Sequence, residues 1–321
     1  MNIQLLIEDS VTGEKLDISE LAQEITWSTS LNGTAGQLSF NLTPSDLNPS
    51  NGSKVWFSIP GKADIFMGYV FTTSLTSTKT LNVVCYDQTR YLKNTDVYIF
   101  KNMAAHEIFE KICKDYQLKY EVAARVNYIC APATRDNRSL MDMIQLALDE
   151  TFVKTGEYLF VRDNFGVLTL DNLSNYRRDY LFDKDLLTID FSYSRSIDED
   201  TATRVKLVRQ GKGQNKTQIS FVTNTEMVNR WGVLLHYETI KEEGTQQELD
   251  DRAKKLLELK GRPTEKLSFT TDGKVDVYAG CGLFVKLDEI SKDKINKFCI
   301  VNSAKHIFKN QEHQMQIEVL L

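Results

Sequence analysis

The chain has 321 residues, with 39 Lys or Arg against 44 Asp or Glu, and a formal net charge of −5. At roughly 100–200 residues per domain, this length allows two or three domains with an ample core. The 41% hydrophobic and 26% charged content excludes a disordered or collagen-like chain, and the charge balance excludes a strongly electrostatic nucleic-acid or membrane binder.

The start of the chain, MNIQLLIED, lacks the basic residues, apolar stretch and cleavage site of a signal peptide. No window reaches the roughly 18 consecutive apolar residues of a membrane span, so we expect no stable membrane insertion. The five cysteines are scattered and form no CxxC pair, which predicts reduced, mostly buried thiols.

Residues 1–95 alternate short β-branched and aromatic runs with turn residues, as expected for a β-sandwich or barrel. Strict alternation in Gln37–Leu42 predicts a strand with one buried face. The predicted strands are Ile3–Glu8, Glu24–Leu31, Gln37–Leu42, Lys54–Ile59, Ile65–Thr73 and Thr80–Tyr86.

Residues 96–187 have a different character and predict an α+β insertion. Apolar residues at helical spacing predict a helix over about Met103–Leu118, and Ser139 is a good N-cap for a second helix that reaches Phe152. A hairpin follows, with strands Glu157–Arg162 and Val167–Leu170.

Strands return in residues 188–321, which we predict to be a second β domain. One helix interrupts them, because Thr245 and Glu248 form a capping box and Gly261 with Pro263 supplies the stop. The predicted strands are Ala202–Arg209, Thr217–Val222, Lys266–Thr270, Leu283–Leu287, Phe298–His306 and His313–Leu320.

None of the motifs examined predicts catalysis. Gly211-Lys212-Gly213 and Gly280-Cys281-Gly282 lack the spacing of a phosphate-binding loop, and the chain has no GxSxG or HExxH. His306 and His313 could face one another on neighbouring strands, although we expect no zinc site there. The acidic run 198–200 and the cluster 176–180 are interpreted as a solvated surface and a loop packed on its own domain. We therefore expect no enzyme activity, no catalytic residue, no metal and no cofactor.

The segment order resembles that of the baseplate hub proteins of contractile phage tails and phage-derived bacteriocins. These form the late-control-D-like family, and the similarity is strongest to its XkdQ/YqbQ-like branch. The stretches that carry the resemblance are Ile25–Ser28, Gly36–Phe40, Ile65–Val70, Val84–Leu92, Ala104–Leu118 and Gly282–Val285.

The resemblance implies a mainly β fold in which two tube-like β-barrel or sandwich domains, 1–95 and 188–321, flank the insertion 96–187. It implies a homotrimeric ring that adapts a six-fold tail tube to a trimeric spike. The expected partners are the tail tube protein, the spike or tip protein, and baseplate wedge, LysM-type and tape-measure proteins, with no specific nucleic-acid recognition. The protein would be made in the bacterial cytoplasm and assembled into a virion or a phage-tail-like particle, a tailocin or contractile injection system.

Two kinds of residue are candidates for subunit contacts. Trp27, Trp56 and Trp231 could lie at an interface, although simple core packing is the favoured interpretation of each. Two polar loops could reach a neighbour, or could be solvated tips; their candidate residues are Gln210, Gly211, Lys212, Gly213, Gln214, Asp288, Glu289 and Lys292. A β-rich cell-surface or glycan-binding module, with Tyr158, Tyr176 and Tyr180 exposed, is the alternative function.

Overall fold

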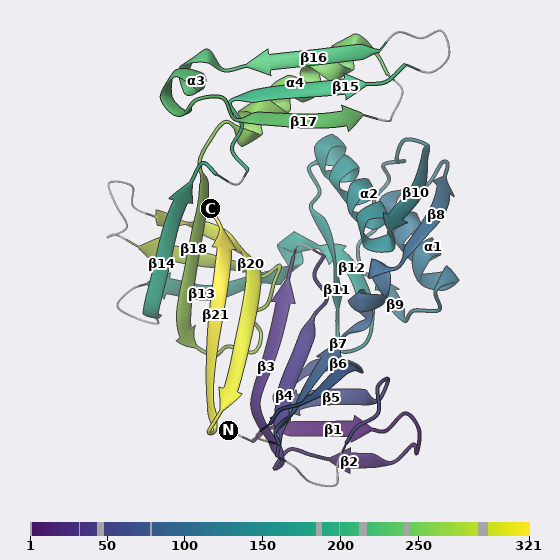
Figure 1. The fold of residues 1–321 in the computed structure, drawn as a ribbon, viewed down its shortest axis with the longest axis vertical. Helices are drawn as coiled ribbons and strands as arrows, with labels where there is room; N and C mark the ends of the chain where they lie inside the picture. The colour runs from purple at the N-terminus through teal and green to yellow at the C-terminus, as the bar shows by residue number, and fades with distance from the viewer. Residues whose placement is uncertain are drawn as a thin grey trace. The chain divides into compact units, whose positions relative to one another are not determined.

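A computed structural model describes residues 2–31, 33–43, 48–77, 79–183, 188–198, 200–211, 217–240, 244–287 and 295–321. Its contacts divide the chain into two compact units (Figure 1). Unit 1 comprises Met1–Ser192 and Ser268–Leu321, and unit 2 comprises Tyr193–Leu267. The fold is mainly β, as predicted. The predicted division into three domains at residues 95/96 and 187/188 stays a prediction.

The N-terminal part of unit 1 is an antiparallel sheet in the order β3-β4-β7-β6-β5-β1-β2. In β4 the alternation places Leu38, Phe40 and Leu42 in the core, as predicted. The strands are β1 (Gln4–Glu8), β2 (Lys15–Asp17), β3 (Ala22–Ser30), β4 (Gln37–Leu42), β5 (Lys54–Ile59), β6 (Ala63–Leu75) and β7 (Leu81–Tyr86). The strands β4 and β5 begin and end at the predicted residues.

The insertion packs two helices and short strands around one core that includes Phe109, Ile112 and Ile144. Ser139 caps α2, because its Oγ accepts a hydrogen bond from the Asp142 amide at 3.1 Å. The elements are η1 (Gln88–Lys93), β8 (Thr95–Phe100), α1 (Ala105–Asp115), β9 (Tyr120–Val122), β10 (Ala133–Ser139), α2 (Leu140–Thr155), β11 (Leu159–Asp163), β12 (Leu168–Asn172) and η2 (Leu173–Tyr176).

The C-terminal strands are organised around β20, which is 15 residues long. Its first half pairs with β19, its second half pairs with β3, and β21 runs along its other side. These strands are β13 (Arg177–Asp183), β14 (Thr188–Ser196), β18 (Thr264–Asp272), β19 (Gly282–Leu287), β20 (Ile295–Lys309) and β21 (Glu312–Leu320). The unit boundaries fall within β14 and β18.

The pairing of β20 with β3 joins the two β parts of unit 1 into one continuous sheet (Figure 1). Its register runs from Ile25 opposite Phe308 to Ser30 opposite Ser303. Phe308 contacts the N-terminal core directly, with its ring centroid 5.0 Å from that of Phe57. The first and last segments of the chain are therefore held together by backbone hydrogen bonds and by shared core side chains.

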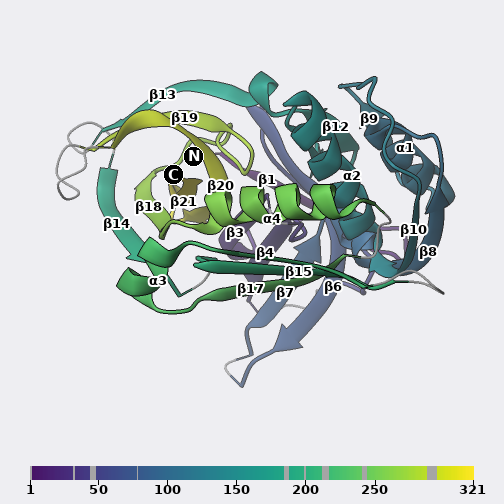
Figure 2. The same cartoon turned by 90° about the horizontal axis from the view of Figure 1, so that it is seen from above.

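Unit 2 is a three-stranded sheet with one face covered by a helix. Its elements are β15 (Arg204–Arg209), β16 (Gln218–Thr223), α3 (Thr225–Trp231), β17 (Leu235–Ile240) and α4 (Gln246–Lys260). Figure 2 shows α4 lying along the sheet, where Leu249 and Ala253 pack on Val205 and Leu207. The predicted strands 202–209 and 217–222 thus belong to a sheet of their own, which they form with β17.

The predicted capping box of α4 is confirmed. Thr245 Oγ1 accepts from the Glu248 amide at 3.2 Å, and the Glu248 carboxylate accepts from the Thr245 amide at 2.8 Å. Within the residues described, no helix has the length and apolar character needed to cross a membrane.

Removing this cap should weaken unit 2. We expect Thr245→Ala to destabilise α4 by about 1 kcal/mol, because the Glu248 amide loses the Thr245 hydroxyl as its acceptor. Hydrogen exchange of the α4 amides measures this loss. The matched control Lys255→Ala, on the exposed side of the same helix, should leave exchange nearly unchanged; equal effects of both substitutions would contradict the capping role.

Candidate functional site

The structure spreads the predicted interface residues over both units. Trp27 is buried and stacks on His306, Trp56 is half-buried with the Lys15 ammonium 4.5 Å from its ring centroid, and Trp231 is half-buried at the end of α3. Gln210 and Gly211 are exposed. Lys212, Gly213, Gln214, Asp288, Glu289 and Lys292 lie outside the described residues. The interface role of all these residues stays a prediction.

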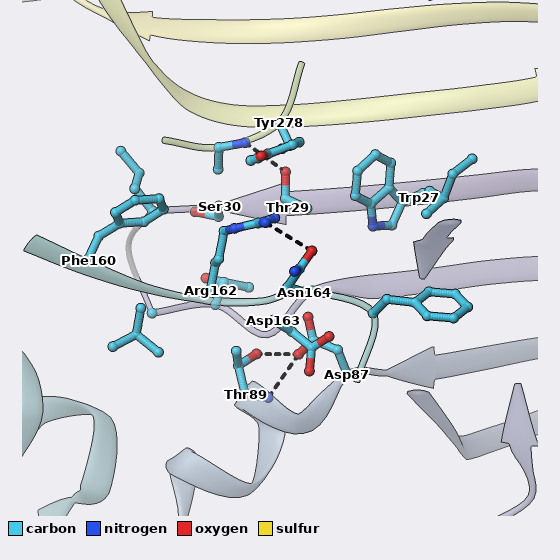
Figure 3. A pocket seen from close by; sticks show the side chains of 18 of the residues that line it. Trp27, Thr29, Ser30, Asp87, Thr89, Phe160, Arg162, Asp163, Asn164 and Tyr278 are labelled. Atoms are coloured by element: carbon cyan, nitrogen blue, oxygen red, sulfur yellow. Dashed lines mark hydrogen bonds between the residues drawn. The ribbon is translucent and has the colours of Figure 1, made fainter. Parts of the chain in front are cut away.

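Unit 1 contains a cavity of about 150 Å³ where three parts of the chain meet. One wall comes from β3 and the loop after it, one from β11 and α2, and one from residues 275–279 (Figure 3). The residues that shape its polar side are Thr29, Asp87, Thr89, Arg162, Asp163 and Asn164. None of these was singled out as a site from the sequence.

Asp87 forms one corner of the cavity at the point where β7 ends and η1 begins. Its side chain accepts from the Thr89 amide at 2.9 Å and from the Thr89 hydroxyl, and therefore caps η1 (Figure 3). The Asp87 amide donates to the Gly36 carbonyl at 3.0 Å. A Cβ on Gly36 would lie 2.0 Å from the Asp87 carboxylate, so only glycine fits there.

Asp163 forms the opposite corner, in the turn of the β11–β12 hairpin. It accepts from the Gly166 amide at 2.6 Å and from the Gln88 amide at 3.3 Å. The Gln88 side chain donates to the Gly166 carbonyl and accepts from the Lys119 amide at 3.2 Å. The end of the N-terminal sheet is thus tied to two loops of the insertion. We call the group Gly36, Asp87, Gln88, Thr89, Asp163 and Gly166 the joint.

Burial sets the protonation of both carboxyl groups of the joint. Burial raises the pKa of Asp87 well above its usual value, and the nearby Asp163 charge raises it further. Burial also raises the pKa of Asp163 to about 6, although the amides of Gly166 and Gln88 oppose this rise. A carboxyl that is neutral for part of the pH range keeps two negative charges from being buried together.

Arg162 ties the hairpin to the third wall of the cavity. Its guanidinium lies 4.7 Å from the Tyr278 ring centroid and 5.0 Å from that of Tyr176, and it donates to the Asn164 side chain at 2.9 Å (Figure 3). Arg178, from the cluster 176–180, donates to the Asp276 carbonyl at 2.8 Å. Residues 177–180 of that cluster lie in β13 and not in a loop, and they contact Asp276 in the C-terminal part of unit 1.

The polar groups of the cavity hold three parts of unit 1 together. Among the described residues that line the cavity there is no histidine, cysteine or lysine, and both buried carboxyl groups are engaged by amides of the same joint. In the described part of the chain no three His, Cys, Asp or Glu side chains gather as a metal site would require. All five cysteines are free and buried.

His306 and His313 do face one another on β20 and β21, at 2.9 Å between Nδ1 and Nε2. Because His306 Nε2 lies 2.8 Å from the Val277 carbonyl, which can only accept, His306 Nε2 carries the proton and its Nδ1 accepts from His313. Burial lowers the pKa of His306 to about 3 and that of His313 to about 4.

The whole chain has the fold of phage tail proteins. The 43 kDa tail protein of prophage MuSo2 from Shewanella oneidensis superposes with a TM-score of 0.74 at 14% identity, covering 99% of this chain and 98% of that one. Such a low identity supports the fold alone.

Sequence comparison identifies the family. The YqbQ-like family model matches residues 25–320. YqbQ of Bacillus subtilis strain 168 is 31% identical over 314 residues, 94% of both chains, and the phage-like element PBSX protein XkdQ is 31% identical over 274 residues, 84% and 82% of the two chains. The chain therefore belongs to the YqbQ-like family.

The joint predicts that Gly36 cannot be enlarged. We expect Gly36→Ala to destabilise unit 1 by about 3 kcal/mol, because the new methyl overlaps the buried Asp87 carboxyl. The control is Gly61→Ala, a turn glycine with open space and a φ of +72°, which should cost about 1 kcal/mol. Urea unfolding measures both; equal losses would contradict the steric role of Gly36.

The histidine pair predicts acid sensitivity of the β20–β21 region. Since both folded-state pKa values lie below the unfolded value of 6.5, the stability they contribute is present above pH 6.5 and is lost as pH falls toward 4. We expect His313→Gln, which keeps a donor for His306, to reduce the loss between pH 7.5 and 5 by about 1 kcal/mol. Urea unfolding at both pH values measures this, with exposed Gln316→Ala on β21 as the control. An unchanged loss in His313→Gln would rule out the pair as the source.

Proposed function

We propose that the protein is the baseplate hub of a contractile tail or phage-tail-like particle, a homotrimeric ring that adapts a six-fold tail tube to a trimeric spike. The observation that carries this proposal is the continuous sheet of unit 1, in which β3 and β20 join an N-terminal and a C-terminal β part. A trimer of such chains presents six β parts around one axis, which is the number that a six-fold tube requires.

Cyclic symmetry gives the arrangement its physical basis. A head-to-tail contact between identical chains closes into a ring when its rotation fits, and three copies then share one axis. In such a ring a neighbour can cover strand edges that would otherwise be open to uncontrolled pairing. β2 and β14 lie at the two ends of the continuous sheet, and their outer edges are candidates for this.

The proposed work is assembly, without chemistry or cofactor. Tail tube and spike proteins are the proposed direct partners, with wedge, LysM-type and tape-measure proteins nearby in the particle. A net charge of −5 per chain suits a ring through which DNA or a tape-measure chain passes without sticking. The relation to XkdQ, a phage-like element protein, supports a place in the tail.

The glycan-binding alternative is less well supported. It depended on three exposed tyrosines, but two of them are engaged within unit 1. The Tyr176 hydroxyl donates to Asp171 at 2.9 Å, and the Tyr180 hydroxyl donates to Asp276 at 3.1 Å. Tyr158 is 39% exposed. A sugar site needs several such rings free on one surface, so assembly remains the better proposal.

The mass of the purified protein in solution tests the proposal. Light scattering over a concentration series should give a mass near three times 36.8 kDa. The same series is repeated with the tail tube and spike proteins of the same particle added. A mass that stays at one chain even with these partners present would overturn the hub proposal.

A further inference from the structure

The sheet of unit 2 has one face covered by α4 and one open face. Val205 and Leu207 point toward α4 and are fully buried, so their neighbours in β15 point the other way. The cross-strand register then fixes the nine residues of the open sheet face: Thr223, Arg204 and Leu235; Phe221, Lys206 and Tyr237; Ile219, Val208 and Thr239.

This open sheet face is unusually apolar for a solvated surface. Ile219, Phe221, Leu235 and Tyr237 are each between 52% and 56% exposed. Single exposed apolar residues are ordinary, but several in one contiguous patch mark an interaction site. The aromatic and aliphatic mixture is that of a protein interface core.

The charge on the open sheet face is entirely positive. Lys206 lies between Phe221 and Tyr237 in the central row, and Arg204 lies beside it with its guanidinium 5.9 Å from the Phe221 ring centroid. No acidic residue is among the nine. The Arg204 Nε is buried and lacks a hydrogen-bond partner among the described residues. A partner of this face should therefore bring carboxylates together with apolar side chains.

Unit 1 carries a surface of that composition at the C-terminal end of α2. Phe152 and Val153 are 45% and 67% exposed, and Phe152 packs edge-on against Tyr158 with ring centroids 5.2 Å apart. Asp149 and Glu157 are exposed beside them, and together they outnumber the exposed cation Lys154 in the last turn of the helix. We call the group Asp149, Phe152, Val153, Glu157 and Tyr158 the α2 end surface.

A hollow of about 260 Å³ adjoins the α2 end surface. Its wall includes Leu31, Met141, Tyr158 and Leu320, with Asp142 also lining it. A hollow of that size and lining can receive an aromatic ring. The Asp149 charge lies close enough to Tyr158 to raise the pKa of its hydroxyl, after the larger effect of burial. Negative charge and apolar side chains are thus interleaved here, as positive charge and apolar side chains are on the open sheet face.

We propose that the open sheet face of one chain docks on the α2 end surface of a second copy. This inference rests on the proposed trimer and identifies its subunit contact. Each chain offers one surface of each kind, so the contact is head-to-tail, the type that closes into a ring. The excess of cations on one surface and of carboxylates on the other gives the contact its direction.

A single-stranded nucleic acid is the main competing occupant of the open sheet face, because aromatic and basic side chains alternate there. The aliphatic Ile219, Val208 and Leu235, together with the net charge of −5, favour a protein surface. Titration with a fluorescent oligothymidine distinguishes a nucleic acid from a protein as the occupant of this face. We expect the protein not to bind the oligothymidine. Tight binding that Phe221→Ser abolishes would overturn the proposal.

Site-directed cross-linking tests the contact. Because all five native cysteines are buried, introduced cysteines supply the reactive thiols. Chains with Tyr237→Cys are mixed with chains carrying Val153→Cys, with the tube and spike proteins present, and treated with a short thiol-reactive cross-linker. We expect a linked pair of chains. The matched control replaces Val153→Cys with Val11→Cys, at a position 80% exposed, and should give little product.

A charge exchange tests the same contact without relying on a cross-link. Lys206→Glu should raise the dissociation constant of the trimer about ten-fold, the equivalent of about 1.4 kcal/mol. Adding Asp149→Lys to the same chain should recover part of this loss. Lys255→Glu on the outer side of α4 is the control and should leave the trimer unchanged.

The outcomes separate this inference from the proposed function. A trimer that neither cross-links at these positions nor responds to Lys206→Glu overturns the contact and leaves the hub intact. A link formed within one chain that carries both cysteines also overturns it. A chain that stays monomeric with its partners present overturns the hub proposal and the contact together.

Discussion

The antiparallel pairing of β3 with β20 is the constraint on which the rest of unit 1 depends. It joins residues 25–30 to residues 303–308, so two strands from near opposite ends of the chain lie side by side. Bringing such distant segments together costs conformational entropy, which backbone hydrogen bonds alone do not offset. Side-chain packing along the β3–β20 pair supplies the remaining stabilisation. Trp27 stacks on His306 with ring centroids 4.8 Å apart, and Phe308 packs on Phe57. This pairing thus joins the two β parts of unit 1 into one continuous sheet.

Three residues of the joint, Asp87, Gln88 and Thr89, lie in the stretch 84–92, one of those that carry the family resemblance. Asp87 ends a strand, caps η1 and accepts bonds from Thr89, while its own amide bonds to Gly36. Gln88 then reaches the hairpin turn at Gly166. These few adjacent residues fix the direction in which the chain leaves the N-terminal sheet and enters the insertion.

Local signals made much of the fold predictable from the sequence. The capping residues Ser139 and Thr245 and the alternation in Gln37–Leu42 depend only on near neighbours, and the structure confirms each. The strand β10 was missed because its sequence is polar and a bulge interrupts its pairing with β8. The separate sheet of unit 2 was missed because its third strand, β17, alternates only weakly and pairs in parallel. The joint could not be predicted from the sequence, because the contact between Gln88 and Gly166 arises from tertiary structure that no local pattern encodes.

Two pairs of buried titratable groups act on stability in opposite directions. The histidine pair has lowered pKa values, so the stability it contributes is lost as pH falls below 6.5. Asp163 has a pKa raised to about 6, so its contribution is greatest at low pH and is lost as pH rises through 6. Between about pH 4 and 6, Asp163 binds a proton in the folded state, whereas His306 and His313 stay unprotonated. The two effects partly cancel, which makes the stability of unit 1 less dependent on pH than either pair would make it alone. For a protein whose proposed role is to hold an assembly together, a weaker dependence of stability on pH is a physical advantage.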